Sequence, residues 1–281
     1  MRAAIDLLEF SYFQRALIAA ILIGFTNGFF SGFVLLRRNA LSLSALSHTM
    51  LPGIVVMVLL TGVLSQTNAF LGALLASLIV GLSSYLISKN SRIPQGTALT
   101  IFYTTAFAIG ISLIPKLSIA QEMDGWLFGN ILAVSNGDLW TFFLIAMVTL
   151  LSSTTFMRPL LITLFEPNVA AAQGVPVRWM NCLLYSQLIL ALVGSYQAVG
   201  SILSIGLLVA PAAIVSLFTN KTSLLFWGGG IIGALSSALA IFISVPFDLP
   251  TGPAIVIVLG LIFIISVIFS SRYGLGKLFS K

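Results

Sequence analysis

The sequence predicts an all-α integral membrane protein that crosses the bilayer eight or nine times. Hydrophobic residues make up 59% of the 281 residues and charged residues only 7%, whereas a soluble domain has about 25% charged residues. Several uncharged stretches reach about 20 residues, the length that a helix needs to span the hydrocarbon core. The basic residues also fall mainly in every second loop between these stretches, as they do in multi-pass membrane proteins.

Nine apolar stretches are the candidate spans. They cover residues 16–36, 40–64, 69–88, 96–115, 138–156, 179–198, 201–219, 224–245 and 252–270. Eight full spans with one re-entrant segment would fit the same pattern. We therefore predict a single transmembrane domain over residues 1–281, with a cytoplasmic loop at about 158–178, rather than a soluble domain with an anchor.

The charge distribution sets the expected orientation. If the N-terminus faces outward, the inner loops hold ten basic residues and the outer segments three. The inner charged residues are then Arg37, Arg38, Lys89, Arg92, Arg158, Glu166, Arg178, Lys221, Arg272, Lys277 and Lys281. This partition follows the positive-inside rule and predicts a cytoplasmic C-terminus. The net charge of +6 is thus explained by topology, and no nucleic-acid partner is predicted.

Two connections between spans are long enough to contain further elements. In the inner loop, Pro167 suits the first turn of a helix and Gly174 suits its end, which predicts a short helix at about 167–173. This helix is either an incidental part of the loop or a docking element for a cytoplasmic partner. The outer connection, residues 116–137, is expected to hold a short interfacial helix with Trp126 and Phe128 at the level of the lipid headgroups.

Small residues recur every four positions in two of the spans. They are Gly24, Gly28 and Gly32 in the first span, and Gly229, Gly233 and Ser237 in the eighth. Such stripes allow helix backbones to approach closely and so predict helix packing. The two halves of the chain show no convincing repeat, which argues against a transporter built from inverted repeats.

The motifs of several enzyme classes are missing from the sequence. It contains no phosphate-binding loop for ATP, no His-Glu-x-x-His zinc motif and only one histidine. It also has no pair of acids within the spans for aspartyl protease chemistry or proton relay, and no acid near the histidine for a serine triad. The sequence therefore favours a conduit over an enzyme.

The single histidine, His48, lies within the second span. It follows Arg38 by ten residues, which places it roughly 15 Å into a hydrocarbon core about 30 Å thick. Pro52 has no N–H, so the carbonyl of His48 loses its helical donor, and Ser44 lies one turn earlier on the same face. His48 either lines a transport path near the midplane or bonds to a neighbouring helix while Pro52 kinks the span.

Other polar side chains have more local explanations. Asn27, Asn181 and Gln187 stand alone within their spans, and we expect each to form a hydrogen bond to another helix. Asp248 lies at the outer mouth between two prolines. It would attract a cation there or stabilise the N-terminus of the ninth helix.

Five separated segments resemble the permease subunits of ABC importers for zinc, manganese and iron. The clearest is Arg37-Arg38 followed by LSHTMLPGI, which matches the family's two basic residues and its Ser-His-x-x-Leu-Pro-Gly motif. The other four are WLFGNILAVSNGDL (126–139), FEPNVAAAQGVPV (165–177), QAVGSILSIGLLVAPAA (197–213) and DLPTGPAIV (248–256). The five occur in the family's order over nearly the whole chain, which makes the combined resemblance specific.

The resemblance implies a fold related to the vitamin B12 importers and a homodimer with the pore between its two copies. It implies an extracytoplasmic metal-binding protein, a cytoplasmic ATP-binding subunit that holds the ATP, and a place in the bacterial plasma membrane. The cargo would be a divalent metal ion, with no permanently bound cofactor. The coupling residues carried over are Glu166, Pro167, Asn168, Ala171 and Gly174.

The sequence departs from the family pattern one turn before the histidine. Family members commonly carry an aspartate there, which forms the metal site with the histidine, but this chain has Ser44. His48 and Ser44 are therefore the expected metal contacts, and zinc or iron is slightly favoured over manganese because manganese prefers carboxylate oxygens. The alternatives are a related permease for a chelated metal or other small cargo, a stand-alone channel or secondary carrier, and an intramembrane enzyme.

Overall fold

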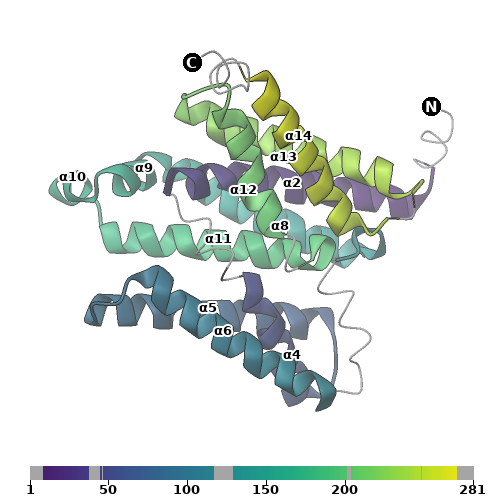
Figure 1. Cartoon of the computed structure of the whole chain (residues 1–281), viewed down its shortest axis with the longest axis horizontal. Helices are drawn as coiled ribbons and strands as arrows, with labels where there is room; N and C mark the ends of the chain where they lie inside the picture. The colour runs from purple at the N-terminus through teal and green to yellow at the C-terminus, as the bar shows by residue number, and fades with distance from the viewer. Residues whose placement is uncertain are drawn as a thin grey trace.

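The computed structural model describes residues 9–37, 45, 47–116, 129–200, 204–247 and 249–270. These residues form α-helices and short 3-10 turns with no strand among them, which confirms the predicted all-α class (Figure 1). The expected interfacial residues Trp126 and Phe128 lie outside the described residues.

Seven of the described helices are long and apolar enough to cross a membrane. They are α2 (Ser11–Arg37), α5 (Gln66–Asn90), α6 (Gln95–Leu113), α8 (Asn136–Thr155), α11 (Val177–Val199), α13 (Thr222–Ser244) and α14 (Thr251–Phe269). The other two predicted spans contain the shorter helices α4 (Met50–Thr61) and α12 (Ser204–Ser216). These two would extend only about 18–20 Å, and residues 38–44 and 46 before α4 and 201–203 before α12 lie outside the described ranges. The count of eight or nine spans is therefore not confirmed.

The inner connection between α8 and α11 is mostly helical, with a second helix before the one predicted at about 167–173. Helix α9 (Met157–Phe165) starts within two residues of the end of α8, and α10 (Pro167–Ala172) follows after Glu166. α10 confirms the short helix predicted at about 167–173. Pro167 occupies its first turn, and Gly174 follows it with a positive φ of 78°.

The predicted glycine stripes meet each other between α2 and α13. A Cβ built on Gly24 would lie 2.6 Å from the Oγ of Ser237, and one built on Gly28 would collide with the carbonyl of Gly229. Gly233 in turn faces the carbonyl of Gly24. The two backbones touch along this antiparallel crossing, so the small residues are required by close approach.

Helix α12 is joined to α2 at its internal proline. The hydroxyl of Ser31 in α2 accepts a hydrogen bond of 2.9 Å from the backbone N–H of Ala212, the residue after Pro211. The same hydroxyl donates to the carbonyl of Gly28 within its own helix. Ser31 thus satisfies a backbone donor beside the position where Pro211 lacks one.

The helices are arranged in two groups with α11 between them (Figure 1). One group holds α2, α8, α12, α13 and α14, and the other holds α4, α5 and α6. Within the described residues, the α4–α6 group reaches the rest of the molecule mainly where α5 contacts α11. The position of α4, and of the histidine before it, therefore depends on its packing against α5 and α6.

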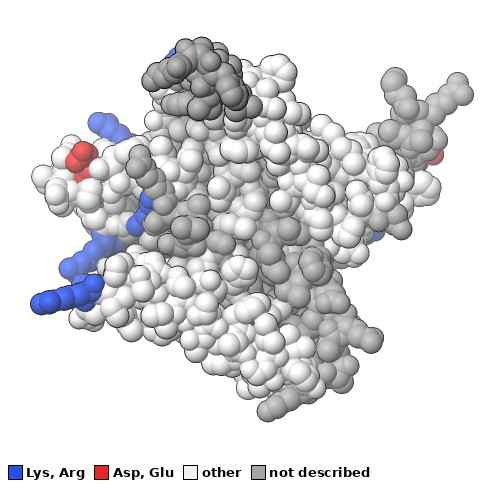
Figure 2. All heavy atoms as spheres, in the orientation of Figure 1, with Lys and Arg blue, Asp and Glu red and all other residues white. Residues whose placement is uncertain are grey.

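Positive side chains gather at the end of the molecule where α9 and α10 lie (Figure 2). The described basic residues near the helix ends on that side are Arg37, Lys89, Arg92, Arg158, Arg178 and Lys221. Lys and Arg accumulate on the cytoplasmic side of membrane proteins, so this is the end that the orientation predicted from the sequence assigns to the cytoplasm, and that orientation stays a prediction.

Candidate functional site

His48 lies just before the start of α4, at the edge of the α4–α6 group. Residues 47 and 48 are helical, Thr49 is in a turn, and α4 begins at Met50. The neighbouring Ser47 and Thr49 are buried, whereas the imidazole is only partly buried. His48 is therefore held in a packed segment while part of its side chain remains accessible.

Two aromatic rings of α6 contact the imidazole. The ring of His48 stacks on Tyr103, with 5.7 Å between the ring centroids and 26° between the planes. The ring of Phe107 meets it edge-on, at 5.9 Å and 70°. One turn further along, Gly110 lies against Pro52, since a Cβ on Gly110 would be 2.7 Å from the Cα of the proline. Tyr103, Phe107 and Gly110 thus form one face of α6 that carries the His48 segment.

An adjoining face of α4 packs against α5 at backbone distance. A Cβ built on Gly53 would lie 2.6 Å from the Cβ of Ala76, and one built on Gly72 would lie 2.8 Å from the Cβ of Met57. The hydroxyls of Thr49 and Ser77 are 3.0 Å apart and form a buried hydrogen bond between the two helices. The turn next to His48 is therefore held by contacts to both α5 and α6.

Pro52 interrupts the helical hydrogen bonds at the expected place. It has no N–H to donate to the carbonyl of His48, and Thr49 is the one turn residue between helical residues 47–48 and α4. Thr49 keeps right-handed helical angles, with φ −77° and ψ −14°, and its carbonyl accepts from the N–H of Gly53 at 3.3 Å. The helical path therefore continues from His48 into α4 with one hydrogen bond missing.

The chemistry available at His48 is that of a single imidazole ligand beside aromatic rings. Imidazole is a preferred ligand of zinc, iron and copper, whereas manganese prefers oxygen ligands. Within the described residues, no three His, Cys, Asp or Glu side chains gather into a metal-binding group. The two other expected contacts, Ser44 and Asp248, lie outside the described residues. α14 begins at Thr251 with Pro250 at its N-cap, and the side chain of Pro250 forms no cap hydrogen bond.

The expected coupling residues lie together around α10. The fully buried Ala170 anchors this short helix, while Glu166, Pro167 and Asn168 at its start are exposed. At its end, the N–H of Gly174 bonds to the carbonyl of Ala171, and the N–H after it bonds back to Ala170 at 2.9 Å. The structure thus presents an exposed, hydrogen-bonded turn of helix at the basic end of the molecule.

Two of the three isolated polar residues form the hydrogen bonds between helices that were expected. The amide oxygen of Asn181 in α11 accepts from Arg37 of α2 at 3.1 Å, and the Arg37 guanidinium also lies over the ring of Tyr185. Gln187 in α11 bonds to two neighbouring serines of α8, at 2.7 and 2.8 Å. Asn27 forms no such bond to any described residue.

Sequence reasoning missed the aromatic residues of α6 as part of this site. Tyr103 and Phe107 are four residues apart and Gly110 follows after three more, a spacing that places all three on one helical face. That spacing was the available signal. It does not identify the partner of the face, because the contact with His48 comes from the packing of α4 on α6.

Comparison with known proteins agrees with this fold. Residues 9–270 match the family described as the ABC 3 transport family. The manganese transport system membrane protein MntC of Halalkalibacterium halodurans is 37% identical over 271 residues, covering 96% of this chain and 91% of that protein. The chelated iron transport system membrane protein YfeD of Yersinia pestis is 31% identical over 261 residues, covering 93% and 86%.

A solved structure shows the same arrangement of helices over the full length. The structure of PsaBC from Streptococcus pneumoniae in complex with Fab contains a chain with 34% sequence identity and a TM-score of 0.87. The alignment covers 99% of each chain. The present chain therefore belongs to the ABC 3 transport family and is a permease subunit of a metal-cation ABC importer, a transport component rather than an enzyme.

Proposed function

We propose that this permease carries Mn²⁺ into the cell, with Fe²⁺ as a second cargo, through a pore formed with a second copy of itself. The names of its relatives support manganese first and iron second. This order replaces the slight preference for zinc or iron that the serine at position 44 suggested. That preference rested on the missing aspartate carboxylate, whereas waters, hydroxyls and carbonyls are also oxygen ligands, the kind that suits manganese.

The observation that carries the proposal is the placement of His48. The imidazole is held by Tyr103 and Phe107, is partly accessible, and belongs to a layer whose outer side chains are apolar and exposed. Exposed apolar side chains of α5 and α6 include Ile79, Leu82 and Ile101. A second copy facing His48 would bring a second imidazole to the path and leave these side chains in contact with lipid or with the partner.

A cytoplasmic ATP-binding subunit would act on this path through α10. In the proposed orientation the basic end of the molecule faces the cytoplasm, and α10 is exposed there beside Glu166. α10 contacts α11, α11 contacts α5, and α5 holds α4. Movement of α10 would therefore reach the His48 segment through packed helices and change its access from one side to the other.

The test is metal uptake by the reconstituted importer. The permease, its ATP-binding subunit and the external binding protein are placed in proteoliposomes, and radioactive Mn²⁺ uptake is followed with Fe²⁺ or Zn²⁺ as competitors. We expect uptake that requires both ATP and the binding protein, with Fe²⁺ competing. Uptake without ATP would show a secondary carrier or channel, and a requirement for a chelator would show that the cargo is a metal complex.

A further inference from the structure

Asn27 is a buried amide in the middle of α2 without a protein partner. Its side chain is 1% exposed, and neither its amide oxygen nor its amide nitrogen has a hydrogen-bond partner among the described residues. Burying an amide without partners is costly, and more so at membrane depth, where lipid supplies none. A group that can bond to both ends of this amide is therefore expected beside it.

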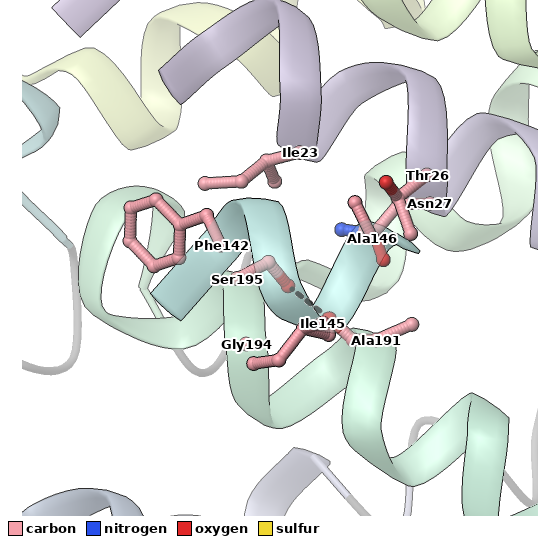
Figure 3. A pocket seen from close by; sticks show the side chains of 9 residues that line it. All are labelled: Ile23, Thr26, Asn27, Phe142, Ile145, Ala146, Ala191, Gly194 and Ser195. Carbon is pink, nitrogen blue, oxygen red and sulfur yellow. Dashed lines mark hydrogen bonds between the residues drawn. The ribbon is translucent and has the colours of Figure 1, made fainter. Parts of the chain in front are cut away.

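The amide borders a small cavity between α2, α8 and α11 (Figure 3). Its polar lining consists of Thr26 and Asn27 from α2 and Ser195 from α11, and the rest of the wall is apolar or glycine. The cavity volume is about 10 Å³. This is close to the smallest volume that holds one water molecule, and such waters need two to four polar partners.

The hydrogen-bonding capacity of the lining matches water. The hydroxyl of Thr26 donates to the carbonyl of Leu22 at 2.8 Å, and that of Ser195 donates to the carbonyls of its own helix at 2.9 and 3.0 Å. Both hydroxyls can then only accept further bonds, while the Asn27 amide offers one acceptor and one donor group. A water molecule that donates to the Asn27 amide oxygen and to one of the hydroxyl oxygens, and accepts from the Asn27 NH₂ group, would give both ends of the amide a partner.

Other ligands fit less well. The three available oxygens are neutral, so they would not offset the cost of removing a cation from water at this depth. An anion would find only the single NH₂ group of Asn27 as a donor. The lining therefore selects a neutral molecule that both donates and accepts hydrogen bonds.

A larger cavity next to this pocket gives water a way in. It has a volume of about 290 Å³ and lies between the N-terminal ends of α5 and α8 and the C-terminal part of α11. Gln66, Thr67 and Thr141 supply polar groups to its wall. The two cavities share Phe142 and Gly194 in their walls, so the small pocket adjoins the larger one.

We propose that the pocket at Asn27 binds an ordered water molecule, supplied from the larger cavity past Phe142, and that this water joins α2 to α11. The site does not depend on which metal the importer carries. It also explains why Asn27 forms none of the direct bonds between helices that Asn181 and Gln187 form.

X-ray radiolysis of the assembled importer in nanodiscs tests the proposal, because hydroxyl radicals formed from bound water oxidise the side chains next to it. Ile23 lines only the small pocket, and Ile241 is fully buried in the core and lines neither cavity. We expect Ile23 to be oxidised several times faster than Ile241. Equal protection of the two isoleucines in the wild-type protein would show a dry pocket and overturn the proposal.

The variant Asn27→Leu distinguishes oxidation by water in the small pocket from oxidation by water in the larger cavity. It fills a similar volume without hydrogen-bonding groups, so oxidation of Ile23 should fall to the level of Ile241 while Phe142 stays labelled from the larger cavity. Unchanged labelling of Ile23 in this variant would contradict the assignment to Asn27. If the variant does not fold, the wild-type comparison still decides.

Brief mixing with ¹⁸O-labelled water in O2-free buffer before irradiation tests the supply route, because in air the oxygen added to an aliphatic side chain would come from dissolved O2. The products of both Ile23 and Phe142 should carry ¹⁸O at the same mixing time. A label on Phe142 alone would contradict entry past Phe142. In a high-resolution map, a density peak at metal-oxygen distances from the three pocket oxygens would identify a cation and overturn the assignment of water.

Discussion

The imidazole of His48 stacks on the phenol ring of Tyr103, with 5.7 Å between the ring centroids and 26° between the planes. Phe107 closes one edge of the same imidazole. The plane of the only histidine is therefore set by two side chains of α6, a helix remote from it in sequence. Metal ligands need such orientation, since a loosely held ring loses affinity and rate.

Replacing Tyr103 with Leu should impair metal transport without unfolding the protein. An aromatic pair is worth about 0.5–1.5 kcal/mol beyond its area, so transport efficiency should fall roughly 2- to 10-fold. Because Tyr103 positions His48, the loss should appear in the KM for metal, with ATP hydrolysis kept. Tyr103→Phe, which retains the ring, should restore the wild-type KM. An equal loss in both variants would show that the hydroxyl matters instead of the stacking.

Replacing Gly28 with Ala should destabilise the contact between α2 and α13. The new Cβ would collide with the carbonyl of Gly229, and overpacking of this kind costs about 1–3 kcal/mol. Gly260→Ala is the matched control, because nothing lies within 4 Å of a Cβ at that helical position. Thermal unfolding in detergent should show a lower midpoint for Gly28→Ala only. Equal midpoints would contradict the backbone contact.

Replacing Ser31 with Ala should weaken the attachment of α12. The N–H of Ala212 would lose its acceptor in a buried place, which costs about 1–3 kcal/mol. Ser112 in α6 is exposed and bonds only to a carbonyl of its own helix, so Ser112→Ala serves as the control. Limited proteolysis or thermal unfolding should distinguish the two variants. Equal stability of the two variants would refute the proposed contribution of the bond between Ser31 and Ala212.

Replacing Gly174 with Ala should impair binding of the ATP-binding subunit. The φ of 78° at Gly174 is left-handed, and a residue with a Cβ pays about 1–2 kcal/mol there. Gly174→Asn should cost less because asparagine tolerates this region, and Gly96→Ala is a control without neighbours within 4 Å. The amount of ATP-binding subunit that co-purifies with the permease should therefore be largest for Gly96→Ala, smaller for Gly174→Asn and smallest for Gly174→Ala. Full retention by Gly174→Ala would contradict docking at α10.

The parts of the fold that the sequence predicted are those with short-range signals. The spacing of the small residues, among them Gly24, Gly28 and Gly233, predicted close contacts between helices without identifying the partner helix. The structure confirms these contacts. Pro167 and Gly174 likewise marked both ends of α10. Proline and glycine restrict or free the backbone locally, so their effect can be predicted without knowing the rest of the fold.

The parts that the sequence could not predict depend on packing between distant residues. An apolar stretch does not reveal where one helix ends and the next begins, so the start of α9 was missed. The pairing of Tyr103 with His48 follows from the packing of α6 on α4. Asn27 was expected to bond to another helix, but its neighbours across the gap are apolar or already bonded.

The central claim is that His48 contacts the metal in the transport path. Its most direct test is Mn²⁺ uptake by proteoliposomes that contain His48→Ala permease, the ATP-binding subunit and the external binding protein, with Tyr85→Ala, an exposed position on α5, as the matched control. The account predicts that His48→Ala loses most uptake while it assembles normally and still hydrolyses ATP, and that Tyr85→Ala transports normally. Uptake by His48→Ala at the wild-type rate and KM would contradict the claim.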